Sequence, residues 1–285
     1  MKEKYTLIGY PLGHSMSPMI HERLFAIPGR DAGYDLTEIA PEELEERVSE
    51  LRQLRGFNVT IPHKQSIIPF LDELGESARR YNSVNCVVND GGKLIGYNTD
   101  CDGFVRSVED YPMDGKVLLV GCGGVGRMMA VEAALHGADL TIGIIPCDQE
   151  RAAALTGEIL AMKPDAKIRI ALTSELDESF DVILNASPVG MYPKTDACPI
   201  SDGLIEKCSY VFDVVYNPVE TTLMRKARAL GKKAVGGAAM LVLQAVKAHE
   251  LWDNDLYTEE QVQEIVRQVE QAVAEQFPLT GGAEK

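Results

Sequence analysis

The chain is organised around a stretch that passes from a hydrophobic run into glycines and then into helix-forming residues: Lys116-Val-Leu-Leu-Val-Gly-Cys-Gly-Gly-Val-Gly-Arg-Met-Met-Ala-Val-Glu-Ala-Ala-Leu-His-Gly137. Lys116 to Val120 is too short for a helix, and its apolar residues do not alternate with polar ones, which predicts a parallel strand covered on both faces. Gly121, Gly123 and Gly126 follow as G-x-G-x-x-G. Strand, glycine turn and helix in this order predict a dinucleotide site, because the N–H groups and dipole of a helix start attract a pyrophosphate.

Length and composition set the class of protein. The 285 residues predict two domains, and 45% hydrophobic with 25% charged residues is typical of a soluble globular protein. The net charge of -15 argues against a surface for nucleic acid or an anionic membrane, and no apolar run approaches the roughly 20 residues of a membrane span. The six cysteines show no C-x-x-C spacing, so we expect free thiols and no metal site. We expect a cytoplasmic protein.

Strands and helices alternate after the glycine stretch, which predicts a parallel sheet with ligand-binding loops at the carboxyl ends of its strands. The predicted strands are Leu140 to Ile145, Ile168 to Ala171, Asp181 to Ala186 and Tyr210 to Val215, with a helix from about Asp148 to Met162. Before the glycine stretch we expect strands at Tyr5 to Tyr10, Tyr34 to Ile39 and Phe57 to Ile61, and a hairpin with Asp90-Gly91 at its turn.

Several polar residues stand where such folds bind ligands, and each has a simpler structural interpretation. Ser17 before Pro18 has the form of a helix N-cap, although Ser15 and Ser17 also offer hydroxyls suited to a carboxylate. Lys64 follows a predicted strand, at a place where α/β folds often carry catalytic residues. The alternative is that Lys64 is an ordinary surface lysine. The run Asn98-Thr99-Asp100 either binds a ligand or caps a helix that begins near Gly103.

The C-terminal part predicts two helices. The first is apolar, begins near Gly236 and carries Gln244, which needs a ligand or a backbone partner if it is buried. The second begins with the capping box Thr258-Glu-Glu-Gln261, and the tail from Pro278 is expected to fray.

Together these residues resemble the shikimate dehydrogenase family over nearly the whole chain. Seven signatures occur in the family's order and spacing: Gly13-His-Ser-Met-Ser-Pro18, Gly56-Phe-Asn-Val-Thr-Ile-Pro-His-Lys64, Val84-Asn85, Asn98-Thr-Asp100, Asn185-Ala-Ser187, Phe212-Asp-Val-Val-Tyr-Asn-Pro218 and Met240-Leu-Val-Leu-Gln244.

The resemblance implies a two-domain α/β fold with the active-site cleft between the domains. A Rossmann-type nucleotide domain with a parallel sheet would span residues 102–237, and a smaller α/β substrate domain would combine residues 1–101 with 238–285. The implied reaction transfers a hydride reversibly between shikimate and NAD or NADP, in the shikimate pathway that leads to chorismate and the aromatic amino acids. The implied protein is a monomer or a homodimer.

The resemblance also implies roles for particular residues. Lys64 and Asp100 would form the catalytic pair. Residues around the substrate would be Ser15, Ser17, Thr60, Asn85, Tyr216 and Gln244. Residues around the cofactor would be Gly121, Gly123, Gly124, Val125, Gly126, Asp148, Arg151, Asn185, Ser187, Gly237 and Met240. A free lysine has a pKa of about 10.4 and is a poor base near neutral pH, so whether Lys64 transfers the proton or only orients the hydroxyl stays open.

The predicted cofactor preference is NAD over NADP. NADP-dependent members of the family commonly carry Asn-Arg-Thr after the second strand of the nucleotide domain, where this chain has Pro146-Cys147-Asp148. Asp148 would repel a 2′-phosphate and could accept hydrogen bonds from a ribose diol. Two alternatives remain: Asp148 only caps the next helix, or Arg151 and Arg127 reach a phosphate.

Three other functions compete with a shikimate-specific enzyme. Quinate is an alternative or additional substrate, although the serine pair favours shikimate. A non-catalytic metabolite sensor of the same fold could lose Lys64 or Asp100, yet both are present. A folate-type methylene dehydrogenase shares the two-domain plan, but Ser15, Ser17 and the Asn98-Thr99-Asp100 run argue against it.

Overall fold

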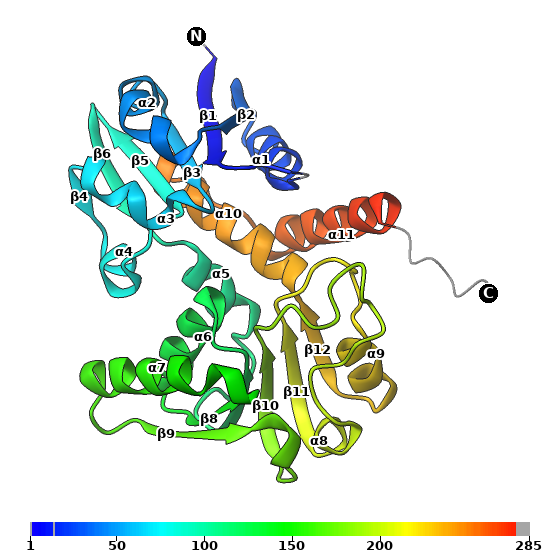
Figure 1. Cartoon of the computed structure of the whole chain (residues 1–285). Coiled ribbons are helices and arrows are strands. Elements are labelled where there is room, and N and C mark those ends of the chain that lie inside the picture. Colours follow the sequence, from blue (N-terminus) through cyan, green and yellow to red (C-terminus); the bar gives the residue numbers. More distant parts are fainter. Residues whose placement is uncertain (1, 14, 278–285) are drawn as a thin grey trace. The chain divides into compact units, whose positions relative to one another are not determined.

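The structure, a computed structural model, describes residues 2–13 and 15–277, and the chain forms two compact units (Figure 1). The first unit consists of Met1–Gly103 with Leu241–Val269, and the second of Phe104–Met240 with Glu270–Lys285. The tail that was expected to fray, from Pro278 onward, lies outside the described residues.

The first unit is built on a six-stranded mixed sheet. β1 pairs in parallel with β2 and β3, β5 pairs antiparallel with β3 and β6, and β4 pairs in parallel with β6. In spatial order the strands are β2 (Ala32–Glu38), β1 (Glu3–Gly9), β3 (Gly56–Val59), β5 (Cys86–Asp90), β6 (Lys93–Tyr97) and β4 (Glu73–Leu74).

Successive side chains of a strand point to opposite sides, so the sheet has apolar side chains on both faces. Both faces are covered by other parts of the unit. Ile8 and Phe57 pack on one face with Leu44 and Leu51 of the helix that follows β2. Tyr5 packs on the other face with Trp252. The helices of this unit are α1 (Ser17–Ala26), α2 (Leu44–Leu51), α3 (His63–Ser66), α4 (Glu76–Tyr81) and the first part of α5 (Asp100–Ser107), with the 3-10 turns η1 (Pro41–Glu43) and η2 (Ile68–Phe70).

The hairpin of β5 and β6 turns one residue later than expected. Asp90 pairs with Lys93, so the two loop residues are Gly91 and Gly92. Both have positive φ angles, 60° and 100°, and glycine adopts such angles without the penalty that other residues bear. Placing the turn at Asp90-Gly91 was therefore wrong by one position.

The second unit contains a fully parallel six-stranded sheet. In spatial order its strands are β12 (Lys233–Gly236), β11 (Cys208–Asp213), β10 (Phe180–Asn185), β7 (Lys116–Val120), β8 (Asp139–Ile144) and β9 (Lys167–Leu172). The sequence predicted five of these strands and missed the short β12. The strands read as nearly continuous apolar runs because helices cover both faces.

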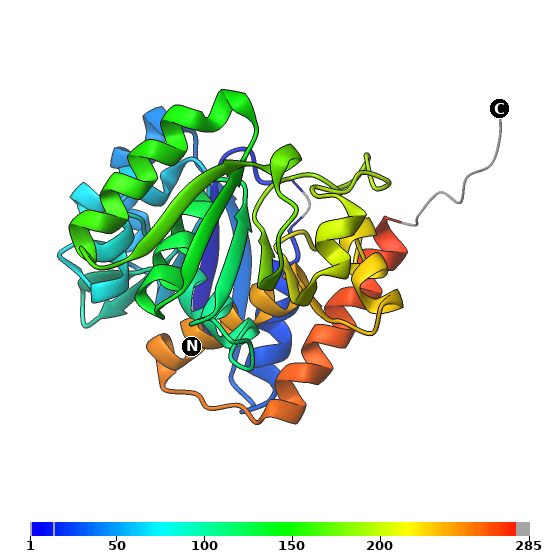
Figure 2. The same cartoon turned by 90° about the horizontal axis from the view of Figure 1, so that it is seen from below.

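The strand order runs in opposite directions from β7 and from β10. Because crossovers between parallel strands are almost always right-handed, this order puts the helices of the second unit on opposite faces of the sheet. Figure 2 shows α7 (green) and α9 (yellow) on the two sides of the strands. The helices are α6 (Gly124–Leu135), α7 (Gln149–Met162), α8 (Asp202–Glu206) and α9 (Thr222–Ala229), with the 3-10 turns η3 (Pro146–Asp148) and η4 (Thr173–Glu175). The predicted α/β fold with a Rossmann-type parallel sheet is confirmed.

Two long helices close the chain: α10 (Gly237–Asp253) and α11 (Glu259–Gln276). The Thr258 N–H donates to Gln261 Oε1 at 2.9 Å, and the Gln261 N–H donates to Thr258 Oγ1 at 3.3 Å. These reciprocal bonds confirm the predicted capping box.

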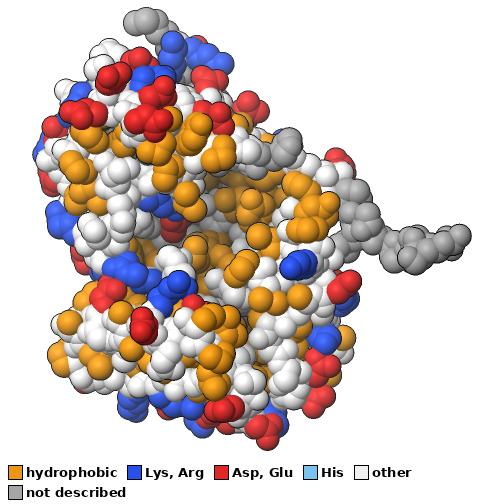
Figure 3. Space-filling view, in the orientation of Figure 1, with side chains coloured by type: hydrophobic (Ala, Val, Ile, Leu, Met, Phe, Trp, Pro, Cys, Tyr) orange, Lys and Arg blue, Asp and Glu red, His pale blue; other side chains and the backbone are white. Residues whose placement is uncertain are grey.

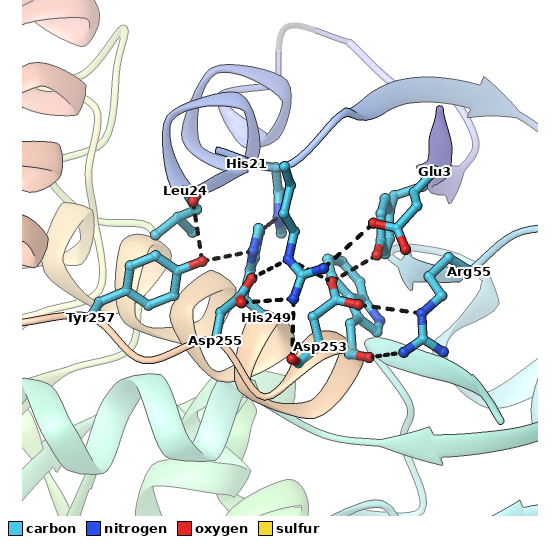
Figure 4. A network of polar contacts seen from close by, with 11 residues as sticks. Glu3, His21, Leu24, Arg55, His249, Asp253, Asp255 and Tyr257 are labelled. Carbon is cyan, nitrogen blue, oxygen red and sulfur yellow. Dashed lines mark hydrogen bonds and ion pairs between the residues drawn. The ribbon is translucent and has the colours of Figure 1, made fainter. Parts of the chain in front are cut away.

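A polar network ties the end of α10 and the segment after it to the start of the chain (Figure 4). Asp253 accepts a hydrogen bond from the Tyr5 hydroxyl at 2.7 Å and from Arg55 Nε at 3.3 Å. Arg30 donates to both oxygens of Asp255, at 2.6 and 2.8 Å. Residues more than 190 positions apart in the sequence are thus fixed to one another in the first unit.

The same network contains two buried histidines. His21 Nδ1 lies 3.0 Å from His249 Nε2, and His249 Nδ1 lies 3.0 Å from the Tyr257 hydroxyl, which donates to the Leu24 carbonyl (Figure 4). Burial lowers the pKa of His249 to about 3 and holds that of His21 well below its ordinary value, so both rings are neutral at neutral pH.

The helix that follows Pro41 has a buried apolar side and a solvated acidic side. Leu44 and Leu51 are buried, whereas acidic side chains gather on the outside of α2 and η1 (Figure 3). The exposed glutamates are Glu42, Glu43, Glu45, Glu46 and Glu50.

All six cysteines are free thiols. No helix within residues 2–13 and 15–277 is long and apolar enough to cross a membrane.

Candidate active site

Lys64 and Asp100 meet in the first unit although 36 residues separate them. Lys64 lies on the short helix α3, five residues past the end of β3 at Val59, and Asp100 is the first residue of α5. Lys64 Nζ donates to Asp100 Oδ2 at 2.7 Å, and the two side chains are 29% and 17% exposed. A charged donor and a charged acceptor at this distance form a strong hydrogen bond that solvent and ligands can still reach.

Asn85 is the residue that gathers the other polar groups. Its side chain is 4% exposed, and its Nδ2 lies 2.9 Å from Asp100 Oδ1, 3.0 Å from Gln244 Oε1 and 3.1 Å from Thr99 Oγ1. Its Oδ1 accepts from the Thr99 N–H at 2.6 Å. Because an amide nitrogen has two hydrogens, three acceptors within 3.1 Å share them, which restrains the side chains of Asp100 and Gln244 together.

Asn85 lies one residue before β5, which begins at Cys86. Its backbone is nevertheless fixed between two strands, because the Asn85 N–H donates to the Tyr97 carbonyl and its own carbonyl accepts from Val59. The N–H of Val84, which precedes Asn85, donates to the Lys64 carbonyl at 2.7 Å. These backbone bonds, together with the side-chain bonds above, hold Lys64, Asn85 and Asp100 in one place.

The Asn98-Thr99-Asp100 run both caps a helix and builds the cluster. Helix α5 begins at Asp100 rather than near Gly103, and Asn98 Oδ1 accepts from the Asp100 N–H at 3.1 Å. The capping interpretation of this run is therefore confirmed, with a helix start at Asp100, and ligand binding by the run stays a prediction.

Ser15 and Ser17 stand at the start of α1, and the predicted N-cap at Ser17 is wrong. Ser17 is the first helical residue, and Met16 occupies the cap without any side-chain hydrogen bond. Ser15 Oγ accepts from the Ser17 N–H at 3.2 Å, so the earlier serine satisfies one of the helix's unpaired donors. Thr60 follows β3, where its N–H donates to the Ile8 carbonyl.

The glycine turn of the second unit has the geometry that its spacing predicted. Gly121 has φ +92°, and a Cβ added to Gly126 would lie 2.2 Å from the Gly121 carbonyl oxygen, so α6 starts as close to the strand end as backbone allows. A Cβ added to Gly123 or Gly124 would meet nothing within 4 Å. The backbone at the first turn of α6 therefore faces open space, and Val125 beside it is 37% exposed.

Asp148 ends η3, the 3-10 turn that follows β8, and occupies the N-cap position of α7, but its side chain makes no cap hydrogen bond. It accepts from Arg151 Nη1 at 2.8 Å instead. Arg127, at the other candidate position for reaching a phosphate, pairs with Glu158. The interpretation of Asp148 as only a helix cap is not supported.

The remaining predicted cofactor residues follow the strand ends of the same sheet. Asn185 ends β10, its Oδ1 accepts from Ser187 Oγ at 2.6 Å, and Ser187 packs against Gly121. Gly237 opens α10, which also carries the buried Met240. Tyr216, predicted to contact substrate, lies in the second unit on the loop after β11 and is 37% exposed.

Comparison with known proteins accounts for this arrangement. The sequence model of the shikimate dehydrogenase substrate binding domain matches residues 7–87. A shikimate dehydrogenase (NADP(+)) of Halothermothrix orenii is 40% identical over 259 residues, which cover 86% of this chain and 89% of that protein.

The chain belongs to the shikimate dehydrogenase family.

Solved structures agree in fold. A shikimate 5-dehydrogenase of Listeria monocytogenes in complex with shikimate and NAD superposes with a TM-score of 0.83 at 31% identity, covering 93% of this chain and 96% of that one. A shikimate 5-dehydrogenase of Thermus thermophilus in complex with NADP(H) and shikimate gives a TM-score of 0.81 at 29% identity, covering 94% and 99%. Members of the shikimate dehydrogenase family thus occur with either cofactor.

One buried carboxylate of the second unit is not among the residues predicted for the site. Asp213 is fully buried at the carboxyl end of β11 and bonds to Asn185, a predicted cofactor residue. The available signal was a single carboxylate inside the apolar run Tyr210 to Val215, because burying a charge there requires nearby donors.

Proposed function

We propose that this protein is a shikimate dehydrogenase, which oxidises a hydroxyl of shikimate to the ketone of 3-dehydroshikimate, and reverses that step, with NAD or NADP. This reaction belongs to the shikimate pathway. The observation that carries the proposal is the Lys64–Asp100 pair, which is held by Asn85 next to Gln244. A non-catalytic sensor would have no need of a partly buried ion pair restrained in this way.

The pair suits the proton transfer that accompanies alcohol oxidation. An ammonium carries three N–H donors, and Asp100 takes one of the three on Lys64, so the other two can approach a substrate hydroxyl. Asp100 orients the lysine, while its second oxygen is fixed by Asn85. When the ketone is reduced, Lys64 stabilises the developing alkoxide and supplies its proton; when the alcohol is oxidised, a neutral Lys64 accepts that proton.

We assign substrate binding to the first unit, within which the matched substrate binding domain lies. Asn85 and Gln244 offer amide groups beside the catalytic pair, and Thr60 follows the neighbouring strand β3. Ser15 and Ser17 offer hydroxyls at the start of α1, where the helix dipole favours a carboxylate. Tyr216 remains a candidate from the family resemblance.

We assign the cofactor to the second unit. The open face of Gly123 and Gly124 at the start of α6 leaves room for a pyrophosphate against the helix N–H groups. Asn185 and Ser187 hold the loop that borders Gly121, and Gly237 and Met240 follow the last strand of the same sheet. The bound nicotinamide supplies the hydride acceptor or donor.

We further propose that NAD is preferred over NADP. A carboxylate at Asp148 opposes a 2′-phosphate, and it also holds Arg151 in an ion pair. The charge of Arg127 is directed to Glu158. A phosphate would have to compete with both carboxylates, whereas a ribose diol would find an acceptor.

The test is a matrix of initial rates with shikimate and quinate against NAD and NADP. We expect turnover with shikimate and a higher kcat/KM for NAD than for NADP. Absence of turnover with every pair would overturn the proposed function. A kcat/KM that favours NADP tenfold or more, which corresponds to about 1.4 kcal/mol, would overturn only the cofactor preference.

Asp148→Ala identifies the residue responsible for that preference. Removing the carboxylate frees Arg151 for a phosphate, so we expect the ratio of kcat/KM for NAD over NADP to fall by about tenfold or more. Asp202→Ala is the matched control, because Asp202 forms a comparable exposed ion pair with Lys226 in the same unit. An unchanged ratio in Asp148→Ala would assign the preference elsewhere.

A further inference from the structure

The parallel sheet of the second unit aligns four residues in a row where its central and flanking strands end. Strand register pairs Val120 with Asn185, Asn185 with Asp213, and Asp213 with Gly236. The glycine turn follows the first of these, and the loop from Ala186 to Gly190 follows the second. Asp213 therefore stands beside the segments proposed to hold the cofactor.

Asp213 is the charged member of this row, and no exposed surface remains on it. Three neutral donors surround its carboxylate. Asn185 Nδ2 donates to Oδ1 at 2.9 Å, the Val215 N–H donates to Oδ1 at 3.1 Å, and Thr221 Oγ1 donates to Oδ2 at 2.7 Å. Burial raises the pKa of Asp213 to about 6, and the three hydrogen bonds oppose that rise.

The ionised carboxylate decides how the Asn185 amide is oriented. A carboxylate only accepts hydrogen bonds, so Asn185 must present its NH₂ group to Asp213 and its oxygen to the other side. That oxygen accepts from the Ser187 N–H at 3.1 Å and from Ser187 Oγ at 2.6 Å, and Ser187 Oγ accepts from the Val189 N–H at 3.3 Å. A proton on Asp213 would turn one acceptor into a donor and remove this constraint.

The constrained loop lies directly against the glycine turn. A Cβ added at Gly121 would lie 3.0 to 3.1 Å from the backbone and Cβ of Ser187, and the Ala186 N–H donates to the Val120 carbonyl at 2.9 Å. Asp213 thus reaches the glycine turn through two intermediates, Asn185 and Ser187, which are both predicted cofactor residues.

We propose that Asp213 is a positioning residue whose ionised carboxylate holds the Asn185–Ser187 loop against the glycine turn in the form that binds the cofactor, so that protonation of Asp213 weakens cofactor binding. This inference rests on the proposed function and adds a proton-dependent control to the same site. Asp213 itself does not contact the reacting atoms.

The groups that face Asp213 from neighbouring elements are neutral near pH 7. β10 presents Asn185, β12 presents Gly236, and the start of α9 presents Thr221. The segment before α8 presents the Cys198 thiol, whose pKa is raised chiefly by burial and slightly by Asp213. Within residues 2–13 and 15–277, Asp213 has no ion-pair partner.

The experiment measures the Kd of NAD by calorimetry from pH 5 to pH 8, since the pyrophosphate of NAD does not titrate in this range. For the wild-type protein we expect Kd to rise about tenfold from pH 8 to pH 5 with a midpoint near 6, because only the ionised fraction binds well. Asp213→Asn should give a Kd that is flat across the same range. The Kd of shikimate should keep the wild-type pH dependence in this variant.

Variants of Thr221 test whether the carboxylate itself titrates, because a purely structural role of Asp213 would not move the midpoint of the pH dependence. Thr221→Val removes one donor to the carboxylate and should move the midpoint upward by about one pH unit or more. Thr221→Ser keeps the hydroxyl and should restore the wild-type midpoint. A midpoint that stays in place in Thr221→Val would contradict the inference.

Two outcomes separate this inference from the proposed function. Wild-type protein that oxidises shikimate but binds NAD with no pH dependence between 5 and 8 overturns the role of Asp213 alone. Wild-type protein that neither oxidises shikimate nor binds NAD overturns both. The wild-type profile decides the matter even if Asp213→Asn does not fold.

Discussion

At the residue scale, the site depends on one buried amide that connects charged and neutral partners. Asn85 contributes no charge, yet its bonds to Asp100 and Gln244 restrain side chains from three separate parts of the sequence. Burial of its side chain excludes water that would otherwise compete for these bonds. Placement of Lys64 and Asp100 is therefore a property of the cluster rather than of either residue.

Removing either charge of the pair should abolish most activity without unfolding the protein. We expect Lys64→Ala and Asp100→Ala to lose about 100- to 10,000-fold in kcat, because general acid–base assistance is typically of this size. Thermal unfolding and shikimate oxidation would be measured together. Lys93→Ala is the control, since Lys93 forms an exposed ion pair with Glu73 on the same sheet. Folded Lys64→Ala protein with wild-type turnover would refute the assignment.

The serines at the start of α1 should affect binding more than turnover. We expect Ser15→Ala to raise the KM for shikimate more than it lowers kcat, because a carboxylate is held similarly in the ground state and the transition state. Ser17→Ala should lack the stability loss of a missing N-cap, because Met16 occupies that position. Normal shikimate affinity in both variants, measured by calorimetry, would place the carboxylate elsewhere.

At the element scale, the junction of β7 and α6 works by close approach of backbone. The first turn of α6 can present its N–H groups only if nothing separates it from the strand end. Gly126 provides that contact, whereas Gly124 faces open space. The two glycines therefore differ in what they contribute: Gly126 is the third glycine of G-x-G-x-x-G, whereas Gly124 stands at a position that the motif leaves open.

Alanine substitutions at Gly126 and Gly124 should have different effects on thermal stability, because only Gly126 is in close contact with other backbone atoms. Gly126→Ala puts a Cβ 2.2 Å from a backbone oxygen, so we expect a clear loss of thermal stability together with weaker NAD binding. Gly124→Ala meets no neighbour and should keep or slightly raise the melting temperature, since alanine favours helices by up to ~1 kcal/mol over glycine. Equal melting temperatures for the two variants would contradict this account of the turn.

At the scale of the whole molecule, α10 and the segment after it return to the beginning of the chain. The polar network fixes Asp253 and Asp255 to Tyr5, Arg30 and Arg55, while Trp252 packs beneath them. The histidine pair belongs to the same contact (Figure 4). Because both rings are buried and neutral, this part of the fold is sensitive to acid.

The pH dependence of stability should show that sensitivity. An unfolded histidine has a pKa of about 6.5, and burial lowers the pKa of His249 to about 3 and that of His21 in the same direction. The stabilising difference is therefore complete above pH 6.5 and is lost as pH falls. We expect each histidine to reduce the free energy of unfolding by about 1.4 kcal/mol per pH unit below 6.

Urea unfolding at pH 7 and pH 5 would measure this effect in wild-type protein and in His249→Gln. Between pH 7 and pH 5 the free energy of unfolding of the variant should fall less than that of the wild type, by about the contribution expected for one histidine. Asp213 acts in the opposite direction, because its raised pKa makes the fold less stable as pH rises from about 4 to 6. Equal losses in wild type and His249→Gln would show that this histidine is not buried in its neutral form.

The sequence alone determined the β7–α6 junction, the parallel sheet and the residues of the candidate site. Each of these depends on local chemistry: an apolar run followed by glycines, strands alternating with helices, and seven short signatures in fixed order. Short or interrupted elements such as β12 and α3 escaped, because a few residues carry too little periodicity to be recognised.

Only the tertiary structure decided how separate parts of the chain act together. The bond of Asn85 to Gln244 spans 159 residues and the contact of His21 with His249 spans 228, and no local pattern encodes either pairing. In the sequence Asp213 is one polar residue in an apolar strand, and only strand register places it beside Asn185. Strand register and burial arise from packing of the whole sheet, and they decide which side chains meet and which charges lose water.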